Sequence, residues 1–151
     1  MFAVTAEGFE AYRRENFRSS VKDWVGPAYG AAKLISSRRL RRAADGYISA
    51  AFGMEDALYQ ACMAQVLGHG GAKERAKLIA EARRCAQKLV GALQILAKAE
   101  VDERPDARDR VILRLTRQIV DPVLKAAVTR ENLARAGLGE FKDIAPHLTL
   151  Q

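Results

Sequence analysis

With 151 residues, the chain is long enough to bury one sizeable hydrophobic core, and we expect a single domain over residues 1–151. Hydrophobic residues make up 49% of it and charged residues 28%, which excludes an intrinsically disordered chain and a membrane-embedded one. The formal net charge of +7 favours a nucleic acid or another acidic partner, although net charge can also serve only to keep a protein in solution.

The first predicted helix covers residues 6–25, where large apolar side chains recur on one face at helical spacing. These side chains are Phe9, Tyr12, Phe17, Val21 and Trp24. Aromatic rings interleave with the basic residues and could stack on nucleic-acid bases: Tyr12, Phe17, Trp24 and Tyr29. Their helical spacing favours a place in the core for Phe17 and Trp24. The Gly26-Pro27 pair should kink or stop this helix, and residues 28–35 form a short continuation. We therefore expect residues 1–26 to be an N-terminal helical extension.

Two long amphipathic helices are predicted in the middle of the chain. Ser36-Ser37 offers an N-cap for the first, which should stop at Gly68-His69-Gly70-Gly71. Its apolar stripe consists of Leu40, Ala44, Tyr47, Ile48, Ala51, Leu58, Cys62 and Val66. The second helix covers residues 72–100 and is followed by a loop over residues 101–105. Its stripe consists of Ile79, Ala82, Ala86, Leu89, Val90, Leu93, Leu96 and Ala97. Steps of three and four residues place each stripe on one helix face.

A fourth long helix should open at Pro105-Asp106, kink at Pro122 and close at Gly137 and Gly139. Its stripe consists of Val111, Ile112, Leu115, Ile119, Val123 and Ala127. Residues 140–151 form a short tail. No segment alternates with period two over more than a few residues, so no strand is expected. Short loops between long amphipathic helices predict an all-α fold, an antiparallel four-helix bundle with the N-terminal extension and the tail.

Positive charge is concentrated in residues 1–42, which hold nine Lys or Arg residues against four acids, or +5 of the total +7. The candidate nucleic-acid-binding residues all come from this segment: Arg13, Arg14, Arg18, Lys33, Arg38, Arg39, Arg41 and Arg42. The densest group is residues 38–42, in which Leu40 should face the core and the four arginines should spread over the outer helix face.

Residues 38–42 start a predicted helix, where unpaired N–H groups and the helix dipole favour an anion. Phosphate is the expected anion, because a guanidinium group binds it through two parallel hydrogen bonds. Two alternatives stay open, a solvated helix face and ion pairs with acids on a partner subunit. More arginines could extend the surface, although they alternate with acids as exposed helix faces do: Arg83, Arg84, Arg108, Arg110, Arg114 and Arg117.

No constellation typical of catalysis is found. His69 lies in a glycine loop and His147 in the tail, and neither has Cys, Asp or Glu at metal-ligand spacing. Phosphate-binding glycine loops and nucleophile elbows are also missing from the sequence. Glu55, beside the apolar stripe of its helix, is expected to be a boundary residue or to pair with an arginine of the facing helix. We therefore expect neither an enzyme nor a cofactor or metal site.

The two cysteines, Cys62 and Cys85, form no CxxC motif and should lie roughly 12 Å apart on facing helices, so two buried thiols are expected. The chain reaches Glu7 before any apolar run develops, which does not resemble a signal peptide. No stretch approaches the roughly 20 apolar residues that span a bilayer. These features predict a cytoplasmic protein without a membrane partner.

Three segments resemble a known family. The third predicted helix ends in Leu93-Gln94-Ile95-Leu96-Ala97, the fourth contains Leu115-Thr116-Arg117-Gln118-Ile119-Val120, and the second contains Leu40-Arg41-Arg42-Ala43-Ala44. Over residues 30–130, this layout resembles the four-helix-bundle accessory variability determinant proteins of diversity-generating retroelements and the related bundle proteins of 23S ribosomal RNA intervening sequences. The chain departs from the family at Asp121-Pro122-Val123-Leu124-Lys125, where the family has a Gly-rich, Trp-containing helix end.

The resemblance implies a homo-oligomeric ring, a pentamer, that binds a reverse transcriptase and its template RNA, but it assigns no role to individual residues. Together with the charge distribution, it favours a non-enzymatic basic accessory subunit that binds nucleic acid, RNA rather than DNA, and a protein partner. The alternative is an oligomeric adaptor whose basic face docks an acidic protein, with the N-terminal helix and the tail as docking elements.

Overall fold

The structure is a computed structural model, in which residues 23–68 and 70–138 are described. Several predictions concern residues outside these ranges: the helix at residues 6–25 apart from its last three residues, the tail, and the candidate residues Arg13, Arg14 and Arg18. His69 and the side chain of Val66 are also outside the description.

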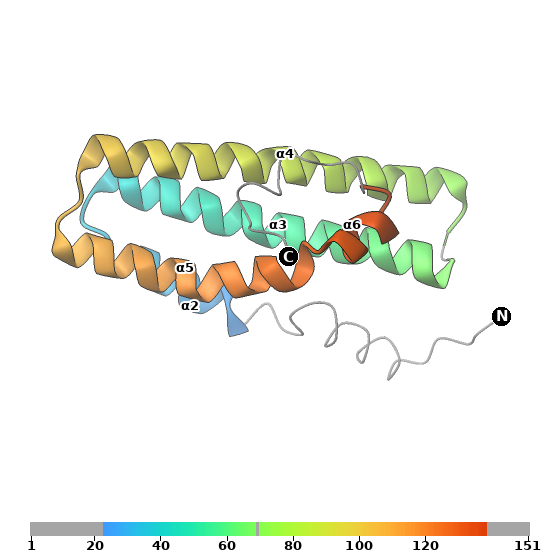
Figure 1. Ribbon diagram of the computed structural model, residues 1–151, viewed down its shortest axis with the longest axis horizontal. Coiled ribbons are helices and arrows are strands. Elements are labelled where there is room, and N and C mark those ends of the chain that lie inside the picture. Colours follow the sequence, from blue (N-terminus) through green and yellow to red (C-terminus); the bar gives the residue numbers. More distant parts are fainter. Residues whose placement is uncertain (1–22, 69, 139–151) are drawn as a thin grey trace.

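The all-α prediction is confirmed for the described part of the chain, which contains five helices and no strand. In chain order the helices are α2 (Val25–Ala32), α3 (Arg38–Leu67), α4 (Ala72–Glu103), α5 (Ala107–Ala127) and α6 (Arg130–Arg135). The three long helices lie side by side, and the chain reverses direction between α3 and α4 and again between α4 and α5 (Figure 1). The short helix α2 packs against α5 and α3. None of the helices described is long and apolar enough to cross a membrane.

The predicted start and end of α3 are confirmed. The Ser37 hydroxyl accepts a hydrogen bond of 3.2 Å from the Leu40 backbone N–H, so it satisfies one of the N–H groups that lack a partner within the helix. At the other end, Gly68 adopts the left-handed conformation with φ 63°, which a glycine reaches without strain. Both boundaries follow from local sequence alone.

Three other boundaries differ from the predictions. Gly26 and Pro27 do not stop a helix but lie in the first turn of α2, where the missing N–H of proline costs nothing. Helix α4 continues through residues 101–103, which were predicted to be loop, and ends at Arg104.

The fourth predicted helix is divided, because α5 ends at Ala127 and α6 begins at Arg130. The Asn132 side chain stabilises this break: it donates a hydrogen bond of 2.9 Å to the Ala127 carbonyl, while the Thr129 hydroxyl accepts one of 3.0 Å from the Asn132 backbone N–H. Side chains thus replace the helical hydrogen bonds lost between the two helices. Gly137, with φ 76°, follows the end of α6. Pro122 lies inside α5, which continues to Ala127.

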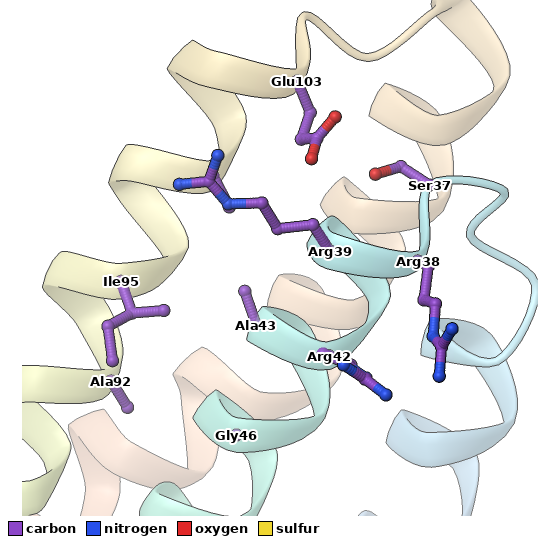
Figure 2. Close-up of a pocket in the computed structure, with 10 residues that line it drawn as sticks. Ser37, Arg38, Arg39, Arg42, Ala43, Gly46, Ala92, Ile95 and Glu103 are labelled. Atoms are coloured by element: carbon purple, nitrogen blue, oxygen red, sulfur yellow. The ribbon is translucent and has the colours of Figure 1, made fainter.

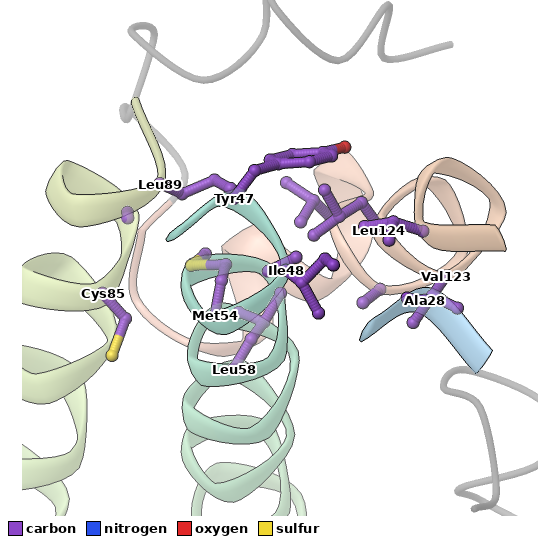
Figure 3. Packing of buried hydrophobic residues seen from close by; sticks show 14 of the residues in the cluster. Ala28, Tyr47, Ile48, Met54, Leu58, Cys85, Leu89, Val123 and Leu124 are labelled. Atoms are coloured by element: carbon purple, nitrogen blue, oxygen red, sulfur yellow. The ribbon is translucent and has the colours of Figure 1, made fainter. Parts of the chain in front are cut away.

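One hydrophobic core joins the helices, with side chains of α2, α3, α4 and α5 in direct proximity (Figure 3). The predicted stripe of α3 is confirmed from Leu40 to Cys62, since every predicted side chain in that range is buried. On α4 the prediction is wrong for Ala97, which is exposed. On α5 it is wrong for Val111 and Leu115, which are 50% and 49% exposed.

The buried face of α5 includes two polar residues, Asp109 and Thr116, that the hydrophobic pattern could not place in the core. Thr116 is buried at low cost, because its hydroxyl donates a hydrogen bond of 2.9 Å to the Ile112 carbonyl of the same helix. Asp109 accepts hydrogen bonds from the backbone before α3. Because both polar groups are satisfied, this side of α5 can face the core, and Val111 and Leu115 on another side of the helix are exposed.

Candidate nucleic-acid interface

The arginines of residues 38–42 occupy the first turns of α3, around a completely buried Leu40. Arg38, Arg39 and Arg42 are exposed, whereas Arg41 is half-buried. The outer face expected from the sequence is therefore made by three of the four arginines.

Two arginines of this group contact other residues of the structure. Arg39 forms an ion pair of 2.8 Å with Asp102 near the end of α4. Arg41 donates a hydrogen bond of 3.0 Å to the Ile35 carbonyl, in the turn between α2 and α3. Arg38 and Arg42 form no ion pair with any residue of the described ranges, and the same is true of Lys33 at the end of α2. These three cations are the ones best placed to meet an external anion.

A groove of about 750 Å³ runs between the first turns of α3 and the last turns of α4. Arg38, Arg39 and Arg42 line one part of it and Glu103 contributes from α4. The remaining lining residues are small or apolar: Ser37, Ala43, Gly46, Ala92, Ile95 and Ala99 (Figure 2). Ile95 is 63% exposed. A hollow of about 520 Å³ shares Gly46, Ala92 and Ile95 and extends the groove along the two helices. The groove thus combines cationic and apolar lining, with the Arg39 side chain extending toward α4 (Figure 2).

A second set of arginines is brought to the same end of the molecule by Asp109. Its carboxylate accepts hydrogen bonds from the backbone N–H groups of Ser36, at 2.9 Å, and Ser37, at 3.3 Å. Arg108 adds a hydrogen bond of 2.9 Å to the Ser36 hydroxyl. The backbone N–H of Ser36 is the main cause that lowers the pKa of Asp109, with Ser37 adding to it, so the carboxylate is anionic at neutral pH.

These contacts place the start of α5 against the start of α3. We call the basic residues of segments 33–42 and 104–114 the arginine-rich end: Lys33, Arg38, Arg39, Arg41, Arg42, Arg104, Arg108, Arg110 and Arg114. The two segments hold these nine basic residues and two acids, a net charge of +7 that equals the formal charge of the whole chain. Both acids have structural roles, because Asp106 caps α5 by accepting from the Asp109 backbone N–H at 2.8 Å.

The sequence pattern identified part of this surface. It selected Lys33 and residues 38–42, and it noted Arg108, Arg110 and Arg114 as an extension without evidence that they lie near α3. Arg104 was missed, because it was assigned to a loop of unspecified conformation. The hydrogen bonds that Asp109 accepts from the Ser36-Ser37 backbone bring the start of α5 close to the start of α3. No local signal in the sequence predicts these hydrogen bonds.

The other residues considered in the sequence do not extend the surface. Trp24 is buried and packs at 6.4 Å between ring centroids from Phe52, which confirms its place in the core. Tyr29 is half-buried, and its hydroxyl shares a hydrogen bond with Ser49. Glu55 is completely buried, so it is not a boundary residue.

Cys62 and Cys85 are both buried and are not joined in a disulfide, as expected. Burial is the first cause that raises the pKa of the Cys85 thiol, and nearby Glu81 adds to it, so the thiol stays protonated at neutral pH. Within the described ranges, no group of three or more His, Cys, Asp or Glu side chains could hold a metal ion.

In comparisons with protein family models, characterised proteins and solved structures, nothing matches this chain. Function is therefore inferred from the chemistry of the arginine-rich end and the groove beside it.

Proposed function

We propose that this protein is a non-enzymatic accessory subunit that binds nucleic acid through the arginine-rich end, with RNA favoured over DNA. The observation that carries the proposal is the convergence of two sequence-distant basic segments, with a combined charge of +7, at one end of the molecule. A phosphate backbone presents regularly spaced negative charges, and guanidinium groups bind them strongly.

The preference for RNA comes from the resemblance to the accessory variability determinant proteins. The same resemblance extends the proposal to a protein partner, a reverse transcriptase, and to a homo-oligomer, with a pentamer as the implied stoichiometry. The antiparallel four-helix bundle predicted from the sequence belongs to this proposal, with α3, α4 and α5 as three of its long helices.

The test is fluorescence anisotropy with structured RNA, single-stranded DNA and duplex DNA, at low and physiological salt. The variant Arg38→Ala/Arg42→Ala removes two exposed arginines without an acidic partner among the described residues. The matched control is Arg83→Ala/Arg130→Ala, which removes the same charge from exposed positions of α4 and α6. Because alanine is a good helix former, neither variant should unfold the protein.

We expect the first variant to weaken binding and the control to leave it nearly unchanged. If both arginines contact phosphates of a single strand, log affinity should depend less steeply on log salt in the Arg38→Ala/Arg42→Ala variant than in the wild type. The magnitude of the slope should decrease by about 1.4, at roughly 0.7 per contact. Equal effects of the two variants would mean that only net charge matters, and the assignment of the interface would be wrong.

A second candidate function is an adaptor that docks an acidic protein. It is favoured by the apolar pair Val111 and Leu115, which lie one turn apart and exposed on α5, with Arg108 and Arg114 each within one turn of Val111. An apolar patch bordered by cations is typical of a protein-binding surface. A protein without affinity for any of the three nucleic acids would favour this function.

A further inference from the structure

A separate cleft lies where the end of α4 faces the first half of α5. Its volume is about 480 Å³, and four arginines from the two helices and the turn between them line it: Arg104, Arg110, Arg114 and Arg117. The remaining lining residues are Glu100, Pro105 and Leu113. This volume is within the range of pockets that hold a small organic ligand. The last turns of α4 separate this cleft from the groove between α3 and α4. Glu100 lines the cleft, and Glu103 lines the groove.

The lining carries a net charge of +3, because one acid stands against four arginines. Glu100 forms an ion pair of 2.5 Å with Arg117. Arg104, Arg110 and Arg114 form no ion pair with any residue in the part of the chain that is described. Arg110 is oriented by a hydrogen bond of 3.0 Å from its Nε to the Pro105 carbonyl, which leaves its two terminal nitrogens for a ligand.

The backbone of Arg104 has an unusual conformation. This residue ends α4 with φ 44°, and among the described residues it is the one residue other than glycine with a positive φ. Helices commonly end in this conformation with a glycine, because a side chain there is strained. An arginine at such a position places a guanidinium in the cleft at a cost in stability, which is characteristic of functional sites.

We infer that this cleft is a binding site for a terminal phosphate, that is, a phosphate monoester. A phosphodiester in a nucleic-acid backbone carries one negative charge, whereas a phosphate monoester carries close to two at neutral pH. In one concave site, three arginines without an acidic partner in residues 23–68 and 70–138 match the greater charge and the three terminal oxygens of the monoester. The phosphate monoester belongs either to the 5′ end of a nucleic acid or to a free nucleotide. The nucleic-acid form of the inference rests on the proposed function, and the nucleotide form does not.

The test uses the full-length protein and a short single-stranded RNA labelled at its 3′ end, with either a 5′ phosphate or a 5′ hydroxyl. Anisotropy at physiological salt gives the ratio of the two affinities, and calorimetry with adenosine monophosphate and with adenosine tests the free nucleotide. Three proteins are compared: wild type, Arg110→Ala/Arg114→Ala, and the control Arg83→Ala/Arg130→Ala. The thermal midpoint of each variant establishes that it is folded.

We expect the 5′-phosphorylated RNA to bind about tenfold more tightly than the 5′-hydroxyl RNA, as charge-assisted hydrogen bonds to one additional charge would give. The preference should disappear in Arg110→Ala/Arg114→Ala and persist in the control. The wild type could bind adenosine monophosphate but not adenosine, and Arg110→Ala/Arg114→Ala could lose this binding. That result would support the site with a free nucleotide as its ligand, even if no RNA binds. Equal binding of both RNAs together with no binding of adenosine monophosphate would overturn the inference.

Discussion

The Tyr47 hydroxyl donates a hydrogen bond of 2.5 Å to the Asp121 carboxylate and so connects α3 to α5 inside the molecule. Tyr47 is almost completely buried. Burial and, after it, the hydrogen bond to Asp121 raise the pKa of Tyr47, so the phenol remains a donor throughout the neutral range. The contact ties the two helices together immediately before Pro122, where α5 lacks a backbone donor.

We therefore expect Tyr47→Phe to lower the free energy of unfolding by about 1–2 kcal/mol, because one hydrogen bond to a charged group is lost and no cavity is created. Urea denaturation followed by circular dichroism measures the change. In the Tyr47→Phe background, Asp121→Asn should cost much less than in the wild type. Additive effects of the two substitutions would show that the hydrogen bond contributes nothing.

Asp109 predicts a dependence of stability on acid. The Ser36 and Ser37 backbone N–H groups lower its pKa in the folded protein, so folding favours the anion. The stabilisation is complete above the ordinary pKa of about 3.9 and is lost as the pH falls through that value toward the lower folded pKa. Denaturation midpoints between about pH 6 and about pH 2.5 should fall more steeply for the wild type than for Asp109→Asn. Parallel curves for the two proteins would contradict the role given to Asp109.

Arg104 and Gly68 each end a long helix with a positive φ. Substitutions at the two positions should change the free energy of unfolding in opposite directions. Arg104→Gly removes the strain of a side chain in the left-handed region and should raise the free energy of unfolding by about 0.5–1 kcal/mol. Gly68→Ala introduces that strain and should lower it by about 1 kcal/mol. Thermal denaturation measures both. A loss of stability in Arg104→Gly would show that the Arg104 side chain is needed for the fold.

The outward orientation of Val111 and Leu115 predicts an interface between protein chains. If the protein is an oligomer, Val111→Gln/Leu115→Gln should reduce its mass in light scattering to that of a smaller species, because two apolar anchors are lost. Glutamine keeps the helix propensity high, so the fold should persist. The matched control is Ile95→Gln/Val101→Gln, which changes two exposed apolar residues of α4. Dissociation in the control alone would place the interface on α4 instead.

The best-predicted part of the structure is α3. Its apolar residues recur at helical spacing, Ser37 caps its start and Gly68 its end, and all three signals lie within a few residues of the features that they determine. Three of the four arginines around Leu40, namely Arg38, Arg39 and Arg42, lie on the outer side as predicted, whereas Arg41 is half-buried. Whether they bind nucleic acid remains a proposal.

The α5 region was predicted less well. Val111, Leu115 and Ile119 border its buried face on one side, so periodicity alone allowed a rotation that buried Val111 and Leu115. The break before α6 was missed because the side-chain hydrogen bonds of Asn132 and Thr129 replace helical ones, and their effect depends on how the chain turns there.

Helix propensity, capping and charge are local properties, and they are enough to predict the helical class, the ends of α3 and one group of arginines. The packing of the helices is needed to know which face of α5 is buried and that Arg104, Arg110 and Arg114 belong to the arginine-rich end. These features depend on hydrogen bonds between residues more than seventy positions apart, at Asp109 with Ser36 and Ser37 and at Tyr47 with Asp121. The geometry of such contacts exists only once the helices have packed.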